Sequence, residues 1–382
     1  MRTIPLVWGL AMCLAAGSAL AATRVVTSTS DDVHDAGSLR HMIGMADPGD
    51  TITFDLQYPA VIALSDANPI PNLYIQKSLV IMGPGADRLA IHPAASYGGF
   101  DVFQPDVPTA DVVVTISGLT VENSSQTGFY TDGFTGIPAY KTYLYLEDVV
   151  IANVFVGVSI NTGGAIVSIV RTTIDGNNSG ISASSAFVTV ADTTLKNNLF
   201  AIGGNTSNIT VVNSTIVGNA FEGSSAVDAG LNTAINLIFT TVAGSPLSAG
   251  WGVRKSDPSA VITLKNSLLA GHFAGNCAPT SPVVSADYNL SDDASCSLAG
   301  AHDIDNVPSG LDPAGLSWNG GPTQTVWLLP SSPALNAIPI ANCTDDTDTA
   351  ITTDQRGATR PDAGACDIGA MESDRVFAAN FD

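Results

Sequence analysis

The chain has 382 residues and a formal net charge of −21 at neutral pH. An acidic surface of this size repels nucleic acid and anionic lipid, so we expect no nucleic-acid partner. Gly, Ser, Thr, Asn and Val are abundant while Lys and Glu are scarce, which favours strands and tight turns over helices.

Residues 1–21 have the pattern of a secretory signal peptide. Arg2 gives a cationic start, an uncharged apolar run extends from Ile4 to Ala16, and small residues precede a cleavage point after Ala21. That run is too short for a transmembrane helix and no later stretch of the sequence is long enough, so no transmembrane segment is predicted. We therefore expect an exported, extracellular or cell-surface protein, with the periplasm as an alternative.

A short capping helix is predicted next. Leu39, Met42, Ile43 and Ala46 recur at helical spacing before the turn residues 47–50. Two later segments, Tyr97–Pro108 and Ser124–Pro138, break the strand pattern and are predicted to be projecting loops. Short apolar runs between the helix and these loops predict strands at Thr51–Phe54, Val61–Leu64, Leu73–Ile75, Leu79–Ile81 and Leu89–Ile91.

A repeat begins near residue 113. When the repeats are aligned on a marker position, two columns before the marker and one after it are almost entirely apolar. The preceding columns start at Val113 and Thr115 in the first repeat and at Tyr143 and Tyr145 in the second. Successive markers are 21 to 30 residues apart. Such intervals are typical of solenoids, so we predict a parallel β-helix whose coils each supply two strands. The markers are Leu119, Val149, Thr173, Thr194, Thr215, Thr241 and Leu268.

Four residues past the marker, an asparagine column recurs. Asparagine tolerates a left-handed backbone, and its amide can both donate to and accept from the asparagine of the next coil. Ser245 and His272 follow in the same column, and His272 is expected to be structural. We therefore predict an internal ladder formed by Asn123, Asn153, Asn177, Asn198 and Asn219.

Four cysteines follow the signal peptide, and Cys13 is expected to leave with it. Three pairings of the four are possible. We favour the pairs nearest in sequence, Cys277 with Cys296 and Cys343 with Cys366, because each closes a short loop at low entropic cost. A zinc site is disfavoured because the sequence has no C-x-x-C motif or clustered histidines beside them.

The repeat pattern ends near residue 275. Residues 22–275 are predicted to form the β-helix with its N-terminal cap, and residues 276–372 the terminal coils and an irregular, disulfide-stapled C-terminal cap. Residues 373–382 form a short tail, for which a sorting signal and a frayed end are equally good interpretations. We expect an all-β protein that is monomeric.

The two ends of this region resemble a known family. The opening segments Gly37–Arg40, Pro48–Phe54 and Lys77–Ala86 are similar to the start of bacterial secreted β-helix repeat proteins. The closing segments Asp287–Leu290, Asn319–Thr325, Ser332–Ala334, Thr353–Gly357, Arg360–Pro361 and Cys366–Glu372 resemble the choice-of-anchor Q domain. The resemblance implies a right-handed parallel β-helix at or outside the cell surface, with no established general chemistry. The residues after Glu372 contain no hydrophobic anchor or sortase-like motif, which departs from the family pattern.

Within the closing motifs, Asp354, Arg356, Arg360, Asp367 and Glu372 are expected to form an ion network that fixes the C-terminal cap.

The candidate catalytic residues are Glu147, Arg171 and Asp192, which the marker alignment places in one column on consecutive coils. An arginine base between acidic calcium ligands would be the remnant of a polysaccharide lyase site. A neutralised surface ladder is the alternative that we favour, because opposite charges facing across strands are a common stabilising device. The sequence suggests no serine, cysteine or histidine nucleophile.

Two further groups are candidates for binding. Asp345, Asp346 and Asp348 have the density of oxygen ligands that calcium favours, although not the spacing of a calcium loop, so a solvated acidic loop is the preferred interpretation. No other cofactor is expected. Aromatic side chains in the predicted loops are suited to stacking on sugars: Phe129, Tyr130, Phe134 and Tyr140.

These features favour a non-enzymatic binding or adhesin-like scaffold that recognises glycans or cell-surface partners. A calcium-assisted polysaccharide lyase, or another carbohydrate-active enzyme of the pectate-lyase-like fold, is the alternative, and it depends chiefly on fold analogy.

Overall fold

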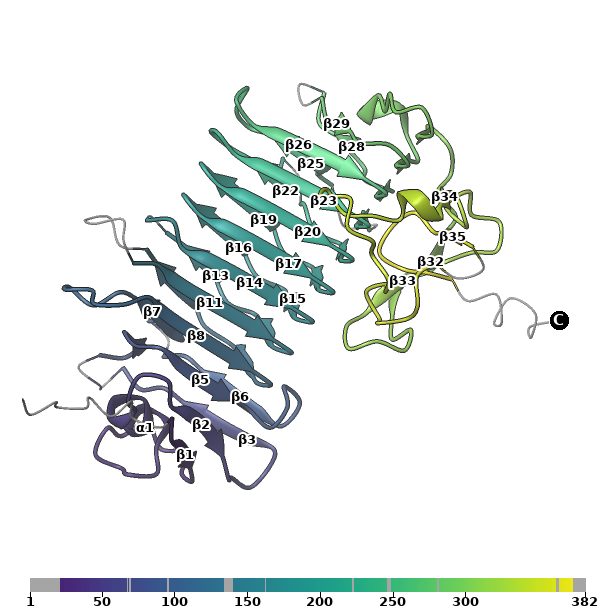
Figure 1. Cartoon of the computed structure of the whole chain (residues 1–382). Coiled ribbons are helices and arrows are strands. Elements are labelled where there is room, and N and C mark those ends of the chain that lie inside the picture. Colours follow the sequence, from purple (N-terminus) through teal and green to yellow (C-terminus); the bar gives the residue numbers. More distant parts are fainter. Residues whose placement is uncertain are drawn as a thin grey trace, which may run out of the picture.

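The computed structural model describes residues 21–373, apart from residues 67, 69, 95, 134–139, 162, 222, 246–248, 280–281 and 362–363. The predicted signal peptide up to residue 20, the candidate Phe134 and the tail from residue 374 lie outside the described residues. The chain winds into the predicted parallel β-helix, with successive coils stacked along one axis (Figure 1).

Each regular coil contributes one strand to each of three parallel sheets, which we name sheets A, B and C. Sheet A consists of β1 (Thr23–Val26), β2 (Thr51–Phe54), β5 (Leu79–Met82), β8 (Val112–Ser117), β11 (Thr142–Glu147), β14 (Ile166–Val170), β17 (Phe187–Ala191), β20 (Asn208–Val212), β23 (Ala234–Ile238), β26 (Val261–Lys265) and β29 (Val284–Ser285). Sheet B consists of β3 (Ala60–Ala63), β6 (Leu89–His92), β9 (Thr120–Glu122), β12 (Val150–Ala152), β15 (Thr173–Asp175), β18 (Thr194–Lys196), β21 (Thr215–Val217), β24 (Thr241–Ala243), β27 (Leu268–Ala270), β30 (Leu290–Ser291) and β31 (Ile304–Asp305). Sheet C consists of β4 (Leu73–Ile75), β7 (Phe100–Phe103), β10 (Thr127–Asp132), β13 (Val156–Ile160), β16 (Ser179–Ser184), β19 (Phe200–Asn205), β22 (Ser225–Ala229), β25 (Trp251–Lys255) and β28 (Gly275–Cys277).

Sheet C corrects the prediction of two strands per coil. Both segments predicted to be projecting loops contain one of its strands, β7 and β10. Their inward side chains Phe100 and Phe129 are fully buried, and the two rings stack with centroids 5.3 Å apart. Phe129 is therefore a core residue, and its assignment as a sugar-binding side chain is wrong.

The register of sheet A confirms the predicted columns from the third repeat onward, where Val167, Val188 and Ile209 are aligned. In the first two repeats the predicted alignment is wrong by one residue, because Val114 and Leu144, rather than Val113 and Tyr143, pair in line with Val167. Side chains alternate between faces along a strand, so this shift turns the predicted inward column outward. In β11 the outward Tyr143 and Tyr145 alternate with inward leucines, and in β8 Val113 faces outward between two inward valines, so the alternation of apolar and polar side chains is weak at these positions.

The asparagine ladder is present, but it is shorter than predicted. Asn177, Asn198 and Asn219 are buried and joined by side-chain hydrogen bonds of 2.9 Å and 3.0 Å from each amide nitrogen to the next Oδ1. Asn123 and Asn153 were assigned to this ladder by the same one-residue error. Both are exposed and occupy left-handed turn positions with φ of 66° and 52°.

The N-terminal helix α1 (Leu39–Met45) confirms the predicted cap. Ser38 caps its first turn by accepting a hydrogen bond from the backbone N–H of His41, at 3.1 Å. Leu39, Ile43 and Ala46 are buried against the first coil, so the helix covers apolar surface at this end.

The C-terminal region first continues the coils and then reverses direction. A disulfide between Cys277 and Cys296 links β28 to the 3₁₀ helix η1 (Ala294–Cys296). Residues 309–373, which we name the C-terminal clamp, then fold back along the flank of sheet B (Figure 1). The clamp contains the strand pairs β32 (Leu311–Ser317) with β33 (Thr325–Leu328) and β34 (Ile338–Pro339) with β35 (Ala365–Cys366), and the 3₁₀ helix η2 (Ile340–Asn342).

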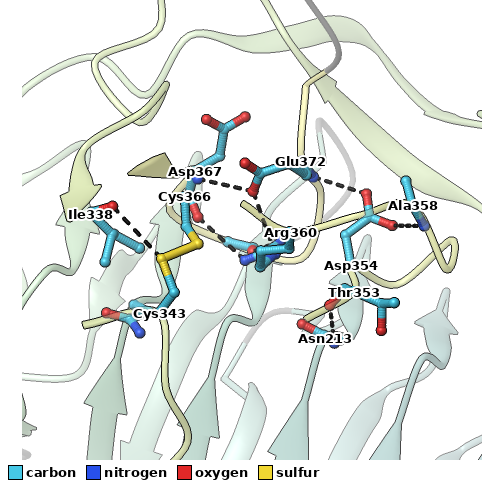
Figure 2. Close-up of polar contacts among 12 residues, drawn as sticks. Asn213, Ile338, Cys343, Thr353, Asp354, Ala358, Arg360, Cys366, Asp367 and Glu372 are labelled. Carbon is cyan, nitrogen blue, oxygen red and sulfur yellow. Dashed lines mark hydrogen bonds and ion pairs between the residues drawn. A yellow bond between two sulfur atoms is a disulfide. The ribbon is translucent and has the colours of Figure 1, made fainter. Parts of the chain in front are cut away.

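The predicted second disulfide and ion network hold the clamp together (Figure 2). Cys343 is bonded to Cys366, as expected from their spacing. Arg360 is fully buried beside the ring of Phe239 from the β-helix, and its Nε lies 3.4 Å from Glu372 Oε2. Asp354 pairs with Arg356 at 2.8 Å and accepts the backbone N–H of Glu372 at 2.9 Å. The network therefore fixes the clamp internally, and Arg360 also packs it on the helix.

Candidate functional site

The outward face of sheet B is divided into a covered part and an open part. The C-terminal clamp covers the later coils: Thr194 Oγ1 donates to the carbonyl of Gln324 at 2.5 Å, and Thr215 Oγ1 bonds Gln355 Oε1 at 2.6 Å. Thr241 Oγ1 accepts from the backbone N–H of Ala370 at 3.0 Å. The same outward column continues into the earlier coils, which the clamp does not cover. Its residues there are Val61, Ala90, Thr120, Val150 and Thr173.

This open part is the floor of a groove of about 700 Å³, which we name the sheet B groove. One margin is formed by turns between sheets A and B, which carry Arg88, Asp148 and Arg171. At the end nearest the clamp, the groove is lined by Trp318 and Pro322 from the loop between β32 and β33. Trp318 is 65% exposed, so its indole is accessible to a ligand in the groove.

Two guanidinium groups line the groove in different electrostatic states. Arg171 Nε lies 2.9 Å from Asp148 Oδ1, and its Nη2 also pairs with Glu147. The hydrogen bonds to Asp148, followed by those to Glu147, raise the pKa of Arg171 despite its partial burial. Arg88 lies over the Tyr58 ring, 4.2 Å from its centroid, and has no ion-pair partner within the described parts of the chain.

Glu122 also lines the groove, and its Oε1 lies 3.0 Å from Nε2 of His92 on the neighbouring coil. Together these groups surround a floor of small aliphatic and threonine side chains. An accessible aromatic ring, hydroxyl groups and a guanidinium without an ion-pair partner among the described residues form a suitable lining for a polyhydroxylated ligand.

The structure brings together only part of the predicted catalytic set. The corrected register places Asp148, rather than Glu147, in the column with Arg171 and Asp192, although both acids contact Arg171. Asp192 lies beneath the clamp, where its carbonyl oxygen accepts a hydrogen bond from Thr323 Oγ1 at 2.9 Å. Burial raises the pKa of Asp192 to about 6, against the opposing effects of Arg171 and Asn213. Asp192 is not among the residues that line the groove.

The three aspartates proposed for calcium each have a separate partner. Asp345 accepts hydrogen bonds from Thr347 and Thr349 within its own turn, Asp346 bonds Asn236 at 3.2 Å, and Asp348 lies 3.7 Å from Lys265. Within the described ranges, no group of three His, Cys, Asp or Glu side chains is arranged to hold a metal ion.

The remaining predicted aromatic residues are dispersed. Tyr130 points outward from sheet C, while Tyr140 is exposed ahead of β11 in sheet A. Sequence reasoning missed Trp318 and Arg88. Trp318 directly precedes the Asn319–Thr325 motif, and a tryptophan beside such a Gly-Gly-Pro loop is the signal that could have identified it.

His272 is buried where the ladder prediction placed it, and its Nδ1 lies 3.1 Å from Asn276 Oδ1. Burial lowers the pKa of His272, so the neutral form is favoured, as expected of a structural histidine.

Comparisons with known proteins support the fold. The structure is similar to the crystal structure of pectate lyase Pel9A, with a TM-score of 0.61 and 12% sequence identity over 94% of this chain and 98% of that one. It is also similar to the structure of XylC in complex with xylose, with a TM-score of 0.50 and 11% identity over 85% of this chain and 65% of that one. No protein-family model matches the sequence, and a search of curated proteins finds no relative. At these identities the comparisons show a pectate-lyase-like parallel β-helix, and the fold alone.

Two features bear on where the protein acts. Both cysteine pairs are disulfide-bonded. In residues 21–373, as far as they are described, no helix is long and apolar enough to cross a membrane.

Proposed function

We propose that this protein is an exported, surface-associated or secreted binding scaffold that recognises glycans through the sheet B groove. The observation that carries the proposal is the open groove itself, which ends at an accessible tryptophan held by the clamp. The clamp bonds to three successive coils and leaves the earlier coils uncovered, so the position of Trp318 relative to the groove floor is fixed.

The charge distribution suggests the kind of glycan. The whole chain is acidic, so a polyanion would be repelled over most of the surface. Within the groove, however, Arg88 offers a guanidinium that can bond hydroxyl or carboxylate oxygens in a bidentate manner. A largely neutral glycan with isolated acidic groups fits both observations.

Binding to immobilised glycans, followed by calorimetry, tests this proposal. Trp318→Ala should weaken binding at least tenfold, because it removes the accessible aromatic surface of the groove. Phe273→Ala is the matched control, since Phe273 is 88% exposed and does not line the groove. Equal affinities for wild type and Trp318→Ala would refute a role for the groove.

The alternative function, a calcium-assisted polysaccharide lyase or another carbohydrate-active enzyme, uses the same groove. A base must lose its proton to act, and the two carboxylates beside Arg171 favour its protonated form, which is why we prefer the scaffold. Polysaccharides incubated with and without calcium would be assayed for unsaturated, ultraviolet-absorbing products and for new reducing ends. Activity that disappears in Arg171→Ala would establish the enzyme instead.

Export, and membership of the choice-of-anchor Q group, are parts of the same proposal. Cleavage after Ala21 would leave Ala22 with a free ammonium group, and the Ala22 nitrogen already lies 2.8 Å from Asp50 Oδ1. Hydrogen bonds from the backbone N–H groups of Ala22 and Asp47, with the Arg24 guanidinium, lower the pKa of Asp50 to about 2. Asp50 is therefore ionised and can pair with the new ammonium group of Ala22. Intact-mass measurement of the secreted protein tests the cleavage position, and a first residue other than Ala22 would contradict it.

A further inference from the structure

Another cavity lies on the outer face of sheet C, a different face of the β-helix from the sheet B groove. It has a volume of about 240 Å³, which corresponds to roughly eight water molecules at about 30 Å³ each and is comparable to a single sugar ring. Its lining is polar and aromatic and comes from the three successive coils that carry β4, β7 and β10: Asn72, Ser96, Tyr97, Gly98, Asp101, Gln126, Thr127 and Tyr130. None of these residues lines the sheet B groove.

The centre of this cavity is an unusual carboxyl group. Asp101 points outward from β7, between Tyr74 of β4 and Tyr130 of β10 in the same column. An outward aspartate is normally solvated, yet Asp101 is only 9% exposed. Its one hydrogen bond in the described structure comes from Asn72 Nδ2, at 2.7 Å, and it has no ion-pair partner there. A carboxyl group buried without a cation costs stability, which is a signature of functional sites.

The aromatic walls are held in place by the fold. Tyr97 lies in the loop before β7, and its carbonyl accepts a hydrogen bond from Ser124 Oγ at 2.9 Å, which ties this loop to the next coil. Gly98 permits the close approach, because a Cβ there would lie 2.8 Å from the carbonyl oxygen of Thr127. On the other side, Tyr130 is held by hydrogen bonds to Asp132 and Asn161, both 3.3 Å long. The cavity is therefore formed before any ligand arrives.

The chemistry of the lining restricts the occupant. Asp101 would repel an anion, and among the described residues no group of three acids, histidines or cysteines is arranged to hold a metal ion here. An apolar ligand would leave the carboxyl group and the amides of Asn72 and Gln126 without new partners. A neutral polyol presents hydroxyl donors to the carboxylate and C–H faces to the tyrosine rings.

We propose that this cavity is a second saccharide-binding site, which holds one neutral sugar ring between Tyr97 and Tyr130 with its hydroxyl groups bonded to Asp101. This site is separate from the sheet B groove, so the proposal does not depend on whether the groove binds a ligand. Two sites on different faces of one rigid coil would allow the protein to bridge two glycan chains.

Hydroxyl-radical footprinting of the full mature protein tests the site. Xylotetraose, cellotetraose and mannotetraose serve as neutral probes, and trigalacturonate serves as the anionic one. At least one neutral probe should protect Tyr97 and Tyr130 from oxidation, and trigalacturonate should not. Protection should persist in Trp318→Ala, which separates this site from the groove. Failure of all three neutral probes to protect these tyrosines would overturn the proposal.

The variant Asp101→Asn distinguishes a binding role from a structural one. It keeps the size of the side chain and an acceptor for Asn72, but it removes the charge. Affinity for the protecting probe should fall about tenfold to a hundredfold, because hydrogen bonds to charged groups are the stronger ones. The melting temperature should rise, because the buried charge is removed. Ser182→Ala, in the same outward column of sheet C but outside the cavity, should change neither quantity. Unchanged affinity or a lowered melting temperature in Asp101→Asn would overturn the proposal.

Discussion

Asn198→Ala should be among the most destabilising single substitutions in the coil. Asn198 is fully buried, and its Oδ1 accepts hydrogen bonds from the backbone N–H and the side-chain amide of Asn177, at 3.0 Å and 2.9 Å. Its own amide donates to the carbonyl of Ile174 at 3.1 Å. Alanine leaves these three groups buried without that partner. At about 1 to 2 kcal/mol for each group, the free energy of unfolding should fall by about 3 to 6 kcal/mol.

The control is an asparagine that sequence alone places in the same ladder. Asn153 is exposed in a left-handed turn, so Asn153→Gly keeps the backbone conformation and breaks no buried bond. Its effect should be within about 0.5 kcal/mol, as for ordinary surface positions. Urea unfolding of each variant, followed by circular dichroism, gives both values. Similar losses of stability in the two variants would refute the register and the ladder described above.

The other predictions concern charge. Burial raises the pKa of Asp101 to about 6 from an ordinary 3.8. Between about pH 4 and pH 6, therefore, Asp101 is protonated in the folded state and ionised in the unfolded state. Wild type should therefore lose stability as the pH rises from about 4 to about 6, and Asp101→Asn should be more stable at pH 7 by about 3 kcal/mol, measured as the difference between the two urea-unfolding profiles. A pH-independent difference would contradict the burial of this carboxyl. Arg360→Ala breaks the buried pair with Glu372 and should cost about 3 to 5 kcal/mol, with faster hydrogen exchange across the clamp. Arg171→Ala, which removes a more exposed ion pair, should cost less than about 1 kcal/mol, and equal effects of the two arginine substitutions would argue against a buried network.

The middle of the coil could be predicted because its repeats are regular. Between Thr173 and Thr215 the interval is constant and apolar residues alternate with polar ones, so only one register buries the apolar face. The capping helix and both disulfides were predicted for equally local reasons: an amphipathic run ending in turn residues, and cysteines close in sequence. The acidic and basic residues of the closing motifs were also correctly expected to form a network.

The candidate sites could be predicted only in part. Arg171 was identified, but the alignment put Glu147 instead of its partner Asp148 in the column, because tyrosines on the outward face of β11 led to a one-residue error. Phe129 was taken for a surface residue because the sheet C strands, such as β10 and β19, mix glycine and polar residues with apolar ones and so lack a clear apolar alternation. The burial of Asp101 could not be predicted from the local sequence, because residues of the neighbouring coils cover it.

The sequence by itself determined that this chain stacks its repeats as a parallel β-helix, because the periodic side chains can be buried only against copies of themselves. It did not determine the path of residues 309–373, which lie along the flank of sheet B and meet residues more than a hundred positions earlier, such as Thr194 and Asn213. Those contacts are made by single hydroxyl and amide groups, which do not recur at regular intervals in the sequence and so give no pattern to recognise. Tertiary structure alone therefore decided which coils are covered, where Trp318 stands, and that an open groove exists.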